Sequence, residues 1–352
     1  MVWTIIIGIV VLSVIIIIHE LGHFFAAKAT GVKVEEFGVG FPPKIYGKKL
    51  GQTIYSINAI PFGGFNRLAG EVDPAVPGGL ASRGIGVRLL VLGGGIIMNL
   101  LLPFLLMSIA YMAPHNIVVG DVVVQEVDPA SPAEMAGILP GDKILSVDGR
   151  AVNNGGDLSR SIQLNLGDEI AITVEHAGGA TETVTAIPRW RPPEGQGSLG
   201  VATLTENYAV ESESLPFWEA IPVGSRSCIE ALVLYKNGIF GMIIGTVPFT
   251  PAGPVGIVQV TGEVAASGIS PLFELTAFIS IAIAITQLIP FPALDGGRIV
   301  FVLLEWVRRG KRVSARIENI VHSVGFLILL MFLVLITYQD IARWISGDSL
   351  IP

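Results

Sequence analysis

The chain has 352 residues, of which 51% are hydrophobic and only 14% are charged, and its mean hydropathy is +0.67. Soluble proteins carry about 25% charged residues, so this composition is typical of an integral membrane protein. The net charge of −7 and the lack of a basic stripe with interleaved aromatic residues argue against a nucleic-acid partner. The single cysteine, Cys228, excludes an internal disulfide and a cysteine-based metal cluster.

Four apolar runs predict membrane-spanning helices, which need about 20 apolar residues each. The runs cover residues 2–27, 87–112, 272–289 and 320–341. The first is too long for the apolar part of a signal peptide and has no basic residue before it, so we expect it to be retained. Residues 217–249 carry Arg226, Glu230 and Lys236 among apolar residues, and we expect an interfacial amphipathic helix followed by a shallow apolar segment.

Charge placement predicts how these helices are oriented. The connection 28–86 holds seven basic residues, and the connection between the third and fourth runs holds six. Residues 113–216 hold five basic and fifteen acidic residues. By the positive-inside rule, the two basic connections are cytoplasmic, and residues 113–216 and both termini lie outside a cell membrane.

The first apolar run contains the sequence HELGH, which has the spacing of a zinc site. His19 and His23 are four residues apart, so they share one face of a helix and can bind one ion. Two imidazoles and a carboxylate suit zinc and leave a fourth position for water. Glu20 is then placed to act as a general base rather than as a ligand. The alternative is a polar patch that holds helices together.

The sequence PFPALDGG offers the third ligand at a matching depth. His19 lies about 25 Å down the first helix at 1.5 Å per residue, which places it in the cytoplasmic half of the membrane. The third run enters from outside and ends on the cytoplasmic side, where Pro290 and Pro292 disrupt the helix and Asp295 follows. We therefore expect Asp295 to complete the site.

Residues 114–206 contain short β-branched runs separated by turn signals. The segment VVVQEVDPASPAEMAGILPGDKILSVDGRAV resembles a PDZ domain. This resemblance implies capture of a peptide C-terminus, with Val119, Gly120 and Val122 in the loop that cradles the carboxylate. Asp121 would place an acidic side chain in that loop, so a domain that acts only as a spacer or size filter is an equal alternative.

HELGH in the first helix, PxPxLDGG after the third and the PDZ-like segment between them resemble the site-2 protease family of intramembrane zinc metalloproteases, in its bacterial PDZ-containing branch. The resemblance implies that His19, His23 and Asp295 bind zinc and that Glu20 is the catalytic base. It also implies substrate or transition-state contacts from Gly95, Asn99 and Gln287, although the family usually has Asn where this chain has Gln287. Asn99 has an equally plain explanation as an amide that packs helices together.

The expected fold class is therefore a polytopic α-helical membrane protein with about four transmembrane helices, a membrane-associated β-hairpin region and one extracytoplasmic PDZ domain of α+β type. The expected parts are residues 1–113 (core, with the hairpin region at 34–70), 114–206 (PDZ domain), 207–271 (linker) and 272–352 (core). The hairpin region is expected to present a substrate strand.

The expected function is regulated intramembrane proteolysis in the lipid bilayer. Single-span membrane proteins, such as anti-sigma factors or remnant signal peptides, are the expected substrates. One alternative is a non-proteolytic PDZ-bearing receptor with a structural zinc, which would need a fourth ligand such as His322. The other is a zinc transporter, which would need further ionisable residues along its spans.

Overall fold

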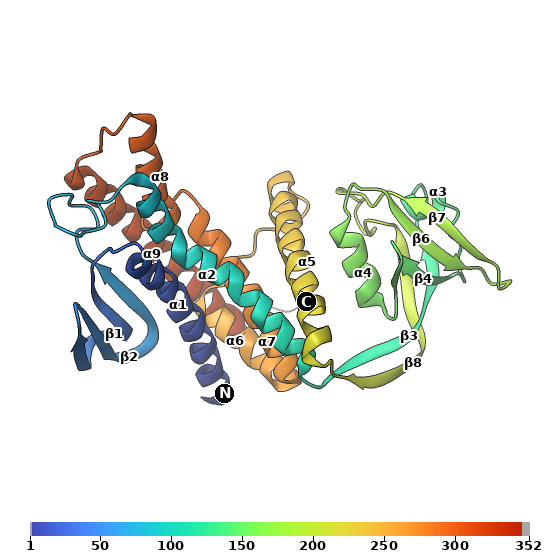
Figure 1. Cartoon of the computed structure of the whole chain (residues 1–352). Helices are drawn as coiled ribbons and strands as arrows, with labels where there is room; N and C mark the ends of the chain where they lie inside the picture. The colour runs from blue at the N-terminus through green and yellow to red at the C-terminus, as the bar shows by residue number, and fades with distance from the viewer. Residues whose placement is uncertain (1, 347–352) are drawn as a thin grey trace. The chain divides into compact units, whose positions relative to one another are not determined.

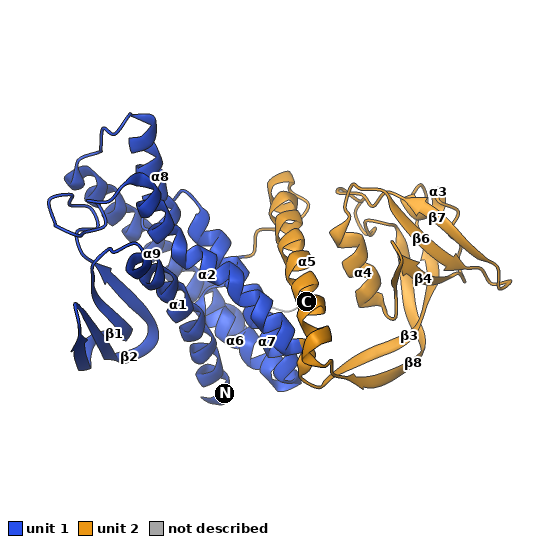
Figure 2. Ribbon diagram, in the orientation of Figure 1, with its two compact units in different colours: residues 1–110, 251–352 blue, residues 111–250 orange. Residues whose placement is uncertain are grey.

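The computed structural model describes residues 2–346 and divides the chain into two compact units (Figure 2). Unit 1 comprises residues 1–110 and 251–352, so two distant parts of the sequence build it together. Unit 2 comprises residues 111–250.

Helices form most of unit 1 (Figure 1). They are α1 (Val2–Ala29), α2 (Ile85–Met112), α6 (Pro254–Ser267), α7 (Ile269–Leu288), α8 (Asp295–Val307) and α9 (Ala315–Ser346). Many large apolar side chains of these helices are exposed, as expected for surfaces that meet lipid rather than water. The helix α9 is the extreme case, since only 11% of its most apolar stretch is buried.

Five described helices are long and apolar enough to cross a membrane, where the sequence predicted about four. Four of them, α1, α2, α7 and α9, correspond to the predicted runs. The fifth is α5 (Phe217–Ile244), which is one continuous helix of 28 residues. The expected division into an amphipathic helix and a shallow segment is therefore wrong. Pro222 removes one backbone hydrogen bond from α5 without ending it.

Small residues bring α1 and α2 into close contact. A Cβ on Gly22 would lie 2.1 Å from the backbone oxygen of Gly94, so only glycine permits this approach. Phe24 and Ala27 of α1 are buried in one hydrophobic cluster with Val91 of α2. The HELGH turn of α1 is thus held directly against α2.

The predicted hairpin region is confirmed as β1 (Val34–Leu50) and β2 (Thr53–Leu68), which pair antiparallel. The hairpin is also folded back on itself. Phe37 pairs with Asn66 on one side and with Tyr55 on the other, so residues 36–39 have β2 on both sides. The Thr53 hydroxyl donates a hydrogen bond to the Val34 carbonyl at 2.9 Å and ties the turn to the base of the sheet.

Unit 2 contains a six-stranded sheet with the order β7-β6-β4-β3-β8, and β5 pairs with β4. Its strands are β3 (His115–Val127), β4 (Lys143–Val147), β5 (Arg150–Ala151), β6 (Ile170–Glu175), β7 (Thr181–Ala186) and β8 (Val201–Glu213). The helices α3 (Pro132–Met135) and α4 (Gly155–Leu164) accompany the sheet, and its core is made of Val, Ile and Leu side chains.

Two features of unit 2 differ from the sequence prediction: where the sheet ends, and where the residues of the predicted carboxylate loop lie. The strand β8 continues to Glu213, which pairs with His115, so the sheet extends beyond the predicted end at residue 206. Val119, Gly120 and Val122 lie inside β3 and not in a loop before the first strand. The Gly120 N–H donates to the Asn153 carbonyl at 2.8 Å, and long-range pairing with β8 extends the strand through the predicted loop.

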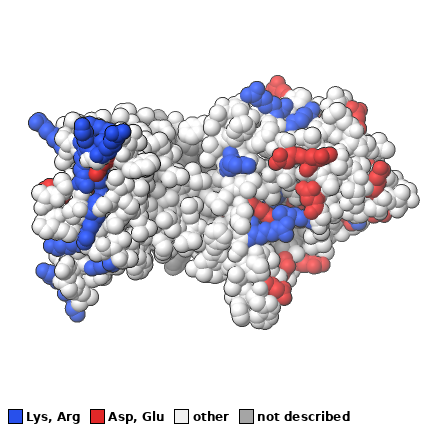
Figure 3. Space-filling model, turned by 45° about the horizontal axis from the view of Figure 1, so that its top comes forward, with Lys and Arg blue, Asp and Glu red and all other residues white. Residues whose placement is uncertain are grey.

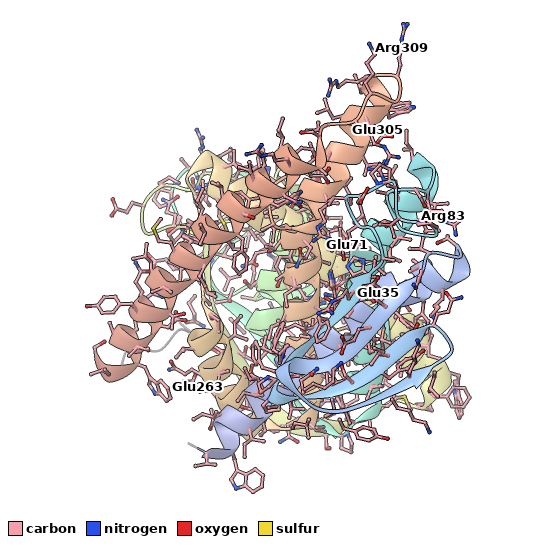
Figure 4. All side chains as sticks on the ribbon, turned by 90° about the vertical axis from the view of Figure 1, so that its left-hand side faces the viewer. Glu35, Glu71, Arg83, Glu263, Glu305 and Arg309 are labelled. Carbon is pink, nitrogen blue, oxygen red and sulfur yellow. The ribbon has the colours of Figure 1, made fainter. Side chains whose placement is uncertain are left out.

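Charged side chains are unevenly distributed over unit 1. Lys and Arg gather at one end of the unit, next to a wide area without charged side chains (Figure 3). Arg309, which follows α8, and Glu263 of α6 lie at opposite ends of the unit (Figure 4).

Candidate metal centre

Three side chains from α1 and α8 meet at one point inside unit 1. The Nε2 atoms of His19 and His23 are 3.2 Å apart. The Oδ2 atom of Asp295 lies 3.0 Å from the first and 3.1 Å from the second. Within residues 2–346, these three side chains are the only group of three or more His, Cys, Asp or Glu side chains arranged to hold a metal ion.

The spacing of these atoms fits a tetrahedral zinc ion. Zinc–nitrogen and zinc–oxygen bonds of 2.0–2.2 Å at tetrahedral angles separate neighbouring ligand atoms by about 3.3 Å. The three observed separations lie just below that value. The Oδ2 atom of Asp295 is buried without a conventional hydrogen-bond partner in the described part of the chain, as expected of an atom that binds a metal.

Hydrogen bonds behind the histidines orient both rings. The Nδ1 atom of His23 lies 2.7 Å from the carbonyl oxygen of Val91, which requires a proton on Nδ1 and leaves Nε2 free for a metal. The Nδ1 atom of His19 lies 3.5 Å from the side-chain amide of the fully buried Asn99. When the Asn99 amide is oriented with Oδ1 toward His19, the Nδ1–H of His19 donates to that oxygen, and Nε2 of His19 is left free for a metal. The Ser280 hydroxyl holds the Asn99 backbone by donating to its carbonyl at 2.8 Å.

Gly95 leaves room for the two histidines. A Cβ at this position would lie 2.6 Å from Nε2 of His19 and 2.6 Å from Nε2 of His23. Any other residue would therefore displace the atoms that are arranged for the metal. Gly95 and Asn99 both lie behind the histidines, and neither lines the cavity in front of them.

The DGG sequence explains how Asp295 reaches α1. A Cβ on Gly296 would lie 2.3 Å from the Ile289 carbonyl, and one on Gly297 would lie 2.3 Å from the Phe291 carbonyl. The two glycines therefore let the start of α8 pack onto the end of α7. Asp295 begins α8, which the sequence analysis did not predict, and its backbone N–H donates to Oε1 of Gln287 at 3.4 Å.

A cavity of about 390 Å³ opens in front of the candidate metal-binding atoms. Glu20 lines it together with the three candidate ligands, as a general base must. Gln287 also lines it, so this predicted residue is at the site although its Oε1 is already bonded. Phe65, Asn66 and Arg298 are among the lining residues that the sequence analysis did not name. The first two lie in the hairpin, where only the fold brings them to α1.

Ion pairs hold the charged end of unit 1 together near this cavity. Arg88 of α2 contacts Glu305 of α8 at 2.5 Å, and both side chains are buried. Arg312 pairs with the other oxygen of Glu305 at 3.0 Å. Arg298, one turn after Asp295, pairs with Glu71 at 2.8 Å (Figure 4 labels Glu71 and Glu305). These charge pairs fix the α8 helix, and the pair of Arg298 with Glu71 lies at the cavity itself.

His322 is not part of the metal-binding group in the described structure. Its Nδ1 accepts a hydrogen bond from the Ala293 backbone N–H at 3.0 Å, and its ring lies against Phe301. Among the described residues, the group of three ligands has no fourth His, Cys, Asp or Glu, which is the arrangement of a catalytic zinc site and not of a closed structural one.

Comparisons with known proteins agree with this chemistry. The model of peptidase family M50 matches residues 7–332, a range that includes all four residues of the HELGH–Asp295 site. "Putative zinc metalloprotease CPE1693" of Clostridium perfringens is 33% identical over 348 residues, which cover 96% of this chain and 98% of the relative. "Putative zinc metalloprotease slr1821" of Synechocystis is 34% identical over 97% of this chain and 95% of the relative.

"Zinc metalloprotease RasP" of Geobacillus kaustophilus is 27% identical over 96% of this chain and 97% of the relative. The similarity to these relatives therefore extends over both units of the chain. Together with the apolar helices, these matches establish a zinc-dependent, membrane-embedded metalloendopeptidase. The chain belongs to peptidase family M50, the site-2 protease family.

Proposed function

We propose that this protein is an intramembrane protease that hydrolyses peptide bonds within membrane-spanning segments, with His19, His23 and Asp295 as its zinc ligands. The observation that carries the proposal is the meeting of three ligand atoms within 3.2 Å of one another where the start of α8 meets α1, a helix of spanning length. Ionisable side chains are rare in such helices and mark functional sites when they occur.

Zinc, when bound, supplies a Lewis acid that polarises the scissile carbonyl and activates water. Glu20 accepts the proton of the attacking water and passes it to the leaving amine. Gly95 leaves space for the side chains of the two histidines. Asn99 and the Val91 carbonyl hold the histidine rings in their orientation. A substrate helix hides its backbone in internal hydrogen bonds, so the segment to be cut must unwind and lie extended along the hairpin.

The charge asymmetry of unit 1 supports an active site toward the cytoplasm of a cell membrane, with both termini and unit 2 outside. We further propose that α5 does not cross the membrane. Glu230 in its middle pairs with Arg150 of β5 and Arg160 of α4, which belong to unit 2. A spanning α5 would hold these arginines at membrane depth, where charges are costly.

The sheet of unit 2 is proposed to be a PDZ domain that inspects or excludes substrates. Its segment order of strand, SPAEMAG helix and GDKILSVDG strand supports the resemblance. A peptide C-terminus at Val119, Gly120 and Val122 would have to displace the pairing of β3 with β8, so the size-filter alternative also stands. Single-span proteins trimmed on the outside, including anti-sigma factors and remnant signal peptides, are the proposed substrates in regulated intramembrane proteolysis.

Cleavage of a single-span substrate in detergent tests the proposal. Wild type, Glu20→Gln and the exposed control Glu35→Gln should be compared, with zinc content measured for each. We expect Glu20→Gln to keep zinc and to lose about 10²–10⁴-fold in rate, because only the proton carrier is removed. The control should match wild type. Equal cleavage by wild type and Glu20→Gln would refute the assigned role.

A further inference from the structure

We propose that the side chain of Asn66 is a substrate-binding residue, whose amide holds the backbone of the cleaved segment beside the scissile bond. This inference rests on the proposed proteolytic function and adds a specificity-determining residue to it. Asn66 lies near the end of β2 and lines the same cavity as Glu20 and the three candidate zinc ligands.

The strand that carries Asn66 has one free edge in the described structure. Residues 64–68 pair with residues 34–39 on one side, and within residues 2–346 no strand pairs with their other side. Phe65, Asn66 and Leu68 of this strand line the active-site cavity. An extended peptide that reaches the metal-binding atoms can therefore add to this edge as a further strand.

The amide of Asn66 is buried without a hydrogen-bond partner. Both Oδ1 and Nδ2 are inaccessible to solvent, and neither is bonded within the described part of the chain. Asn58, in the same sheet, shows the usual arrangement of a buried amide, since its Nδ2 donates to the carbonyls of Val39 at 3.2 Å and Gly40 at 3.1 Å. A buried polar group left unpaired is destabilising, so Asn66 is arranged for a partner that arrives from outside.

The partner that fits is a peptide backbone. An amide offers a donor and an acceptor together, and an extended peptide presents a carbonyl oxygen and an N–H to match them. Membrane-spanning segments are mainly apolar, so their backbone supplies most of the polar groups once they unwind. Gln287 cannot take this role in full, because its Oε1 already accepts from the Asp295 N–H.

The test compares wild type, Asn66→Ala and the control Arg67→Gln on a single-span substrate, with zinc content and the midpoint of thermal unfolding measured for each. Arg67 is the exposed neighbour on the same strand, and it does not line the cavity. For Asn66→Ala we expect about a tenfold fall in kcat/KM, mainly through a higher KM. Zinc content should stay unchanged, and the unfolding midpoint should be equal or higher.

A fall in activity that comes with a lower unfolding midpoint would assign Asn66 a structural role and overturn the inference. Full activity of Asn66→Ala alongside an active wild type would also overturn it.

Disulfide cross-linking tests the contact without any cleavage. Asn66→Cys is placed in a Cys228→Ser and Glu20→Gln background, and single cysteines are moved along the substrate. We expect cross-links only within about two residues of the scissile bond, since successive residues of a strand advance by about 3.3 Å. Cross-links spread evenly along the substrate, or none at all, would contradict the inference. If wild type fails to cleave, the proposed function fails, but cross-links confined to one short stretch of the substrate still show whether Asn66 contacts it.

Discussion

The helices α1 and α5 each have 28 residues, and each is long and apolar enough to cross a membrane. They differ in what their ionisable residues contact. His19 and His23 of α1 face Asp295, which comes from the far end of the sequence, and Glu20 opens onto the same cavity. Glu230 of α5 is surrounded by arginines of its own unit.

This contrast shows why length and apolar composition do not decide the role of a helix. In α1, the polar side chains converge on one point that suits a metal ion, so their burial serves chemistry. In α5, they attach the helix to a folded domain. The Asn237 side chain donates to the Gln163 carbonyl of α4 at 2.7 Å, two turns from Glu230. The two helices therefore differ in what their polar side chains contact, and not in whether they carry polar side chains.

Cysteine labelling at the two ends of α5 gives the largest contrast, because its outcome is all or none. Trp218→Cys and Ile243→Cys, both at exposed positions, are made in a Cys228→Ser background. In sealed right-side-out vesicles, a membrane-impermeant maleimide should label both, since we propose that α5 stays outside. Asp157→Cys and Arg309→Cys serve as the outer and inner controls. Labelling of only one end of α5 would establish α5 as a fifth span and would contradict the contrast drawn between α1 and α5.

Replacement of Gly95 by alanine should be the most damaging small change in α2. The added Cβ would lie 2.6 Å from both Nε2 atoms, so the histidines must move apart. A displacement of this size is expected to reduce proteolysis about 10²-fold, with a loss of bound zinc. Gly93→Ala is the matched control, because nothing lies within 4 Å of its Cβ position. Equal zinc content in the two variants would show that the approach of α2 to the histidines is not essential.

Removal of the Glu230 carboxylate tests the attachment of α5 to its unit. Glu230 is nearly buried and meets Arg150 at 2.6 Å and Arg160 at 3.1 Å. The arginines are about a third exposed and can return to water, so we expect Glu230→Ala to lower the free energy of unfolding by about 1 kcal/mol. Thermal unfolding in detergent measures the effect. The exposed Lys236→Ala on the same helix should have none, and identical midpoints for both variants would contradict the ion-pair account.

The smallest predicted effect is a pH dependence in unit 2. Hydrogen bonds from His176 to Asp142 at 2.8 Å and to Glu182 at 3.3 Å raise the pKa of His176 above its ordinary value. The stabilisation is therefore complete below about pH 6.5, the pKa of an unfolded histidine, and is lost as pH rises through the raised pKa. His176→Gln should lower the unfolding midpoint more at pH 5.5 than at pH 9. An effect independent of pH would mean that the charge of His176 does not contribute.

The sequence predicted that His19, His23 and Asp295 would lie together, because the bilayer restricts where polar groups can lie. Counting residues along two apolar runs placed His19 and Asp295 at one depth, and the structure brings them within hydrogen-bonding distance. The start of α8 could not be predicted from the sequence. The residue before Asp295 is Leu294, whose side chain makes no capping hydrogen bond, so no local signal marks the beginning of the helix. The role of Gly95 also depends on the crossing of α1 and α2, which no local pattern encodes.

The folding of the hairpin back on itself and the continuity of α5 could not be predicted for another reason. Asn66 reaches the cavity only because β1 and β2 fold back on each other, and this register depends on long-range pairing. Charged residues among apolar ones suggested two separate segments at 217–249. Contacts with unit 2 through Glu230 and Asn237 accompany a continuous helix instead, so tertiary context overrides local propensity there.

The most direct test of the central claim is the zinc X-ray absorption spectrum of the purified protein and of Asp295→Cys. Wild type should bind one zinc with two histidine nitrogens and oxygen at about 2.0–2.2 Å and no sulfur. The variant should add one sulfur at about 2.3 Å, because the new thiolate replaces the carboxylate as a ligand. Zinc bound with the same all-nitrogen-and-oxygen spectrum in both proteins would show that Asp295 does not bind the metal and would contradict this account.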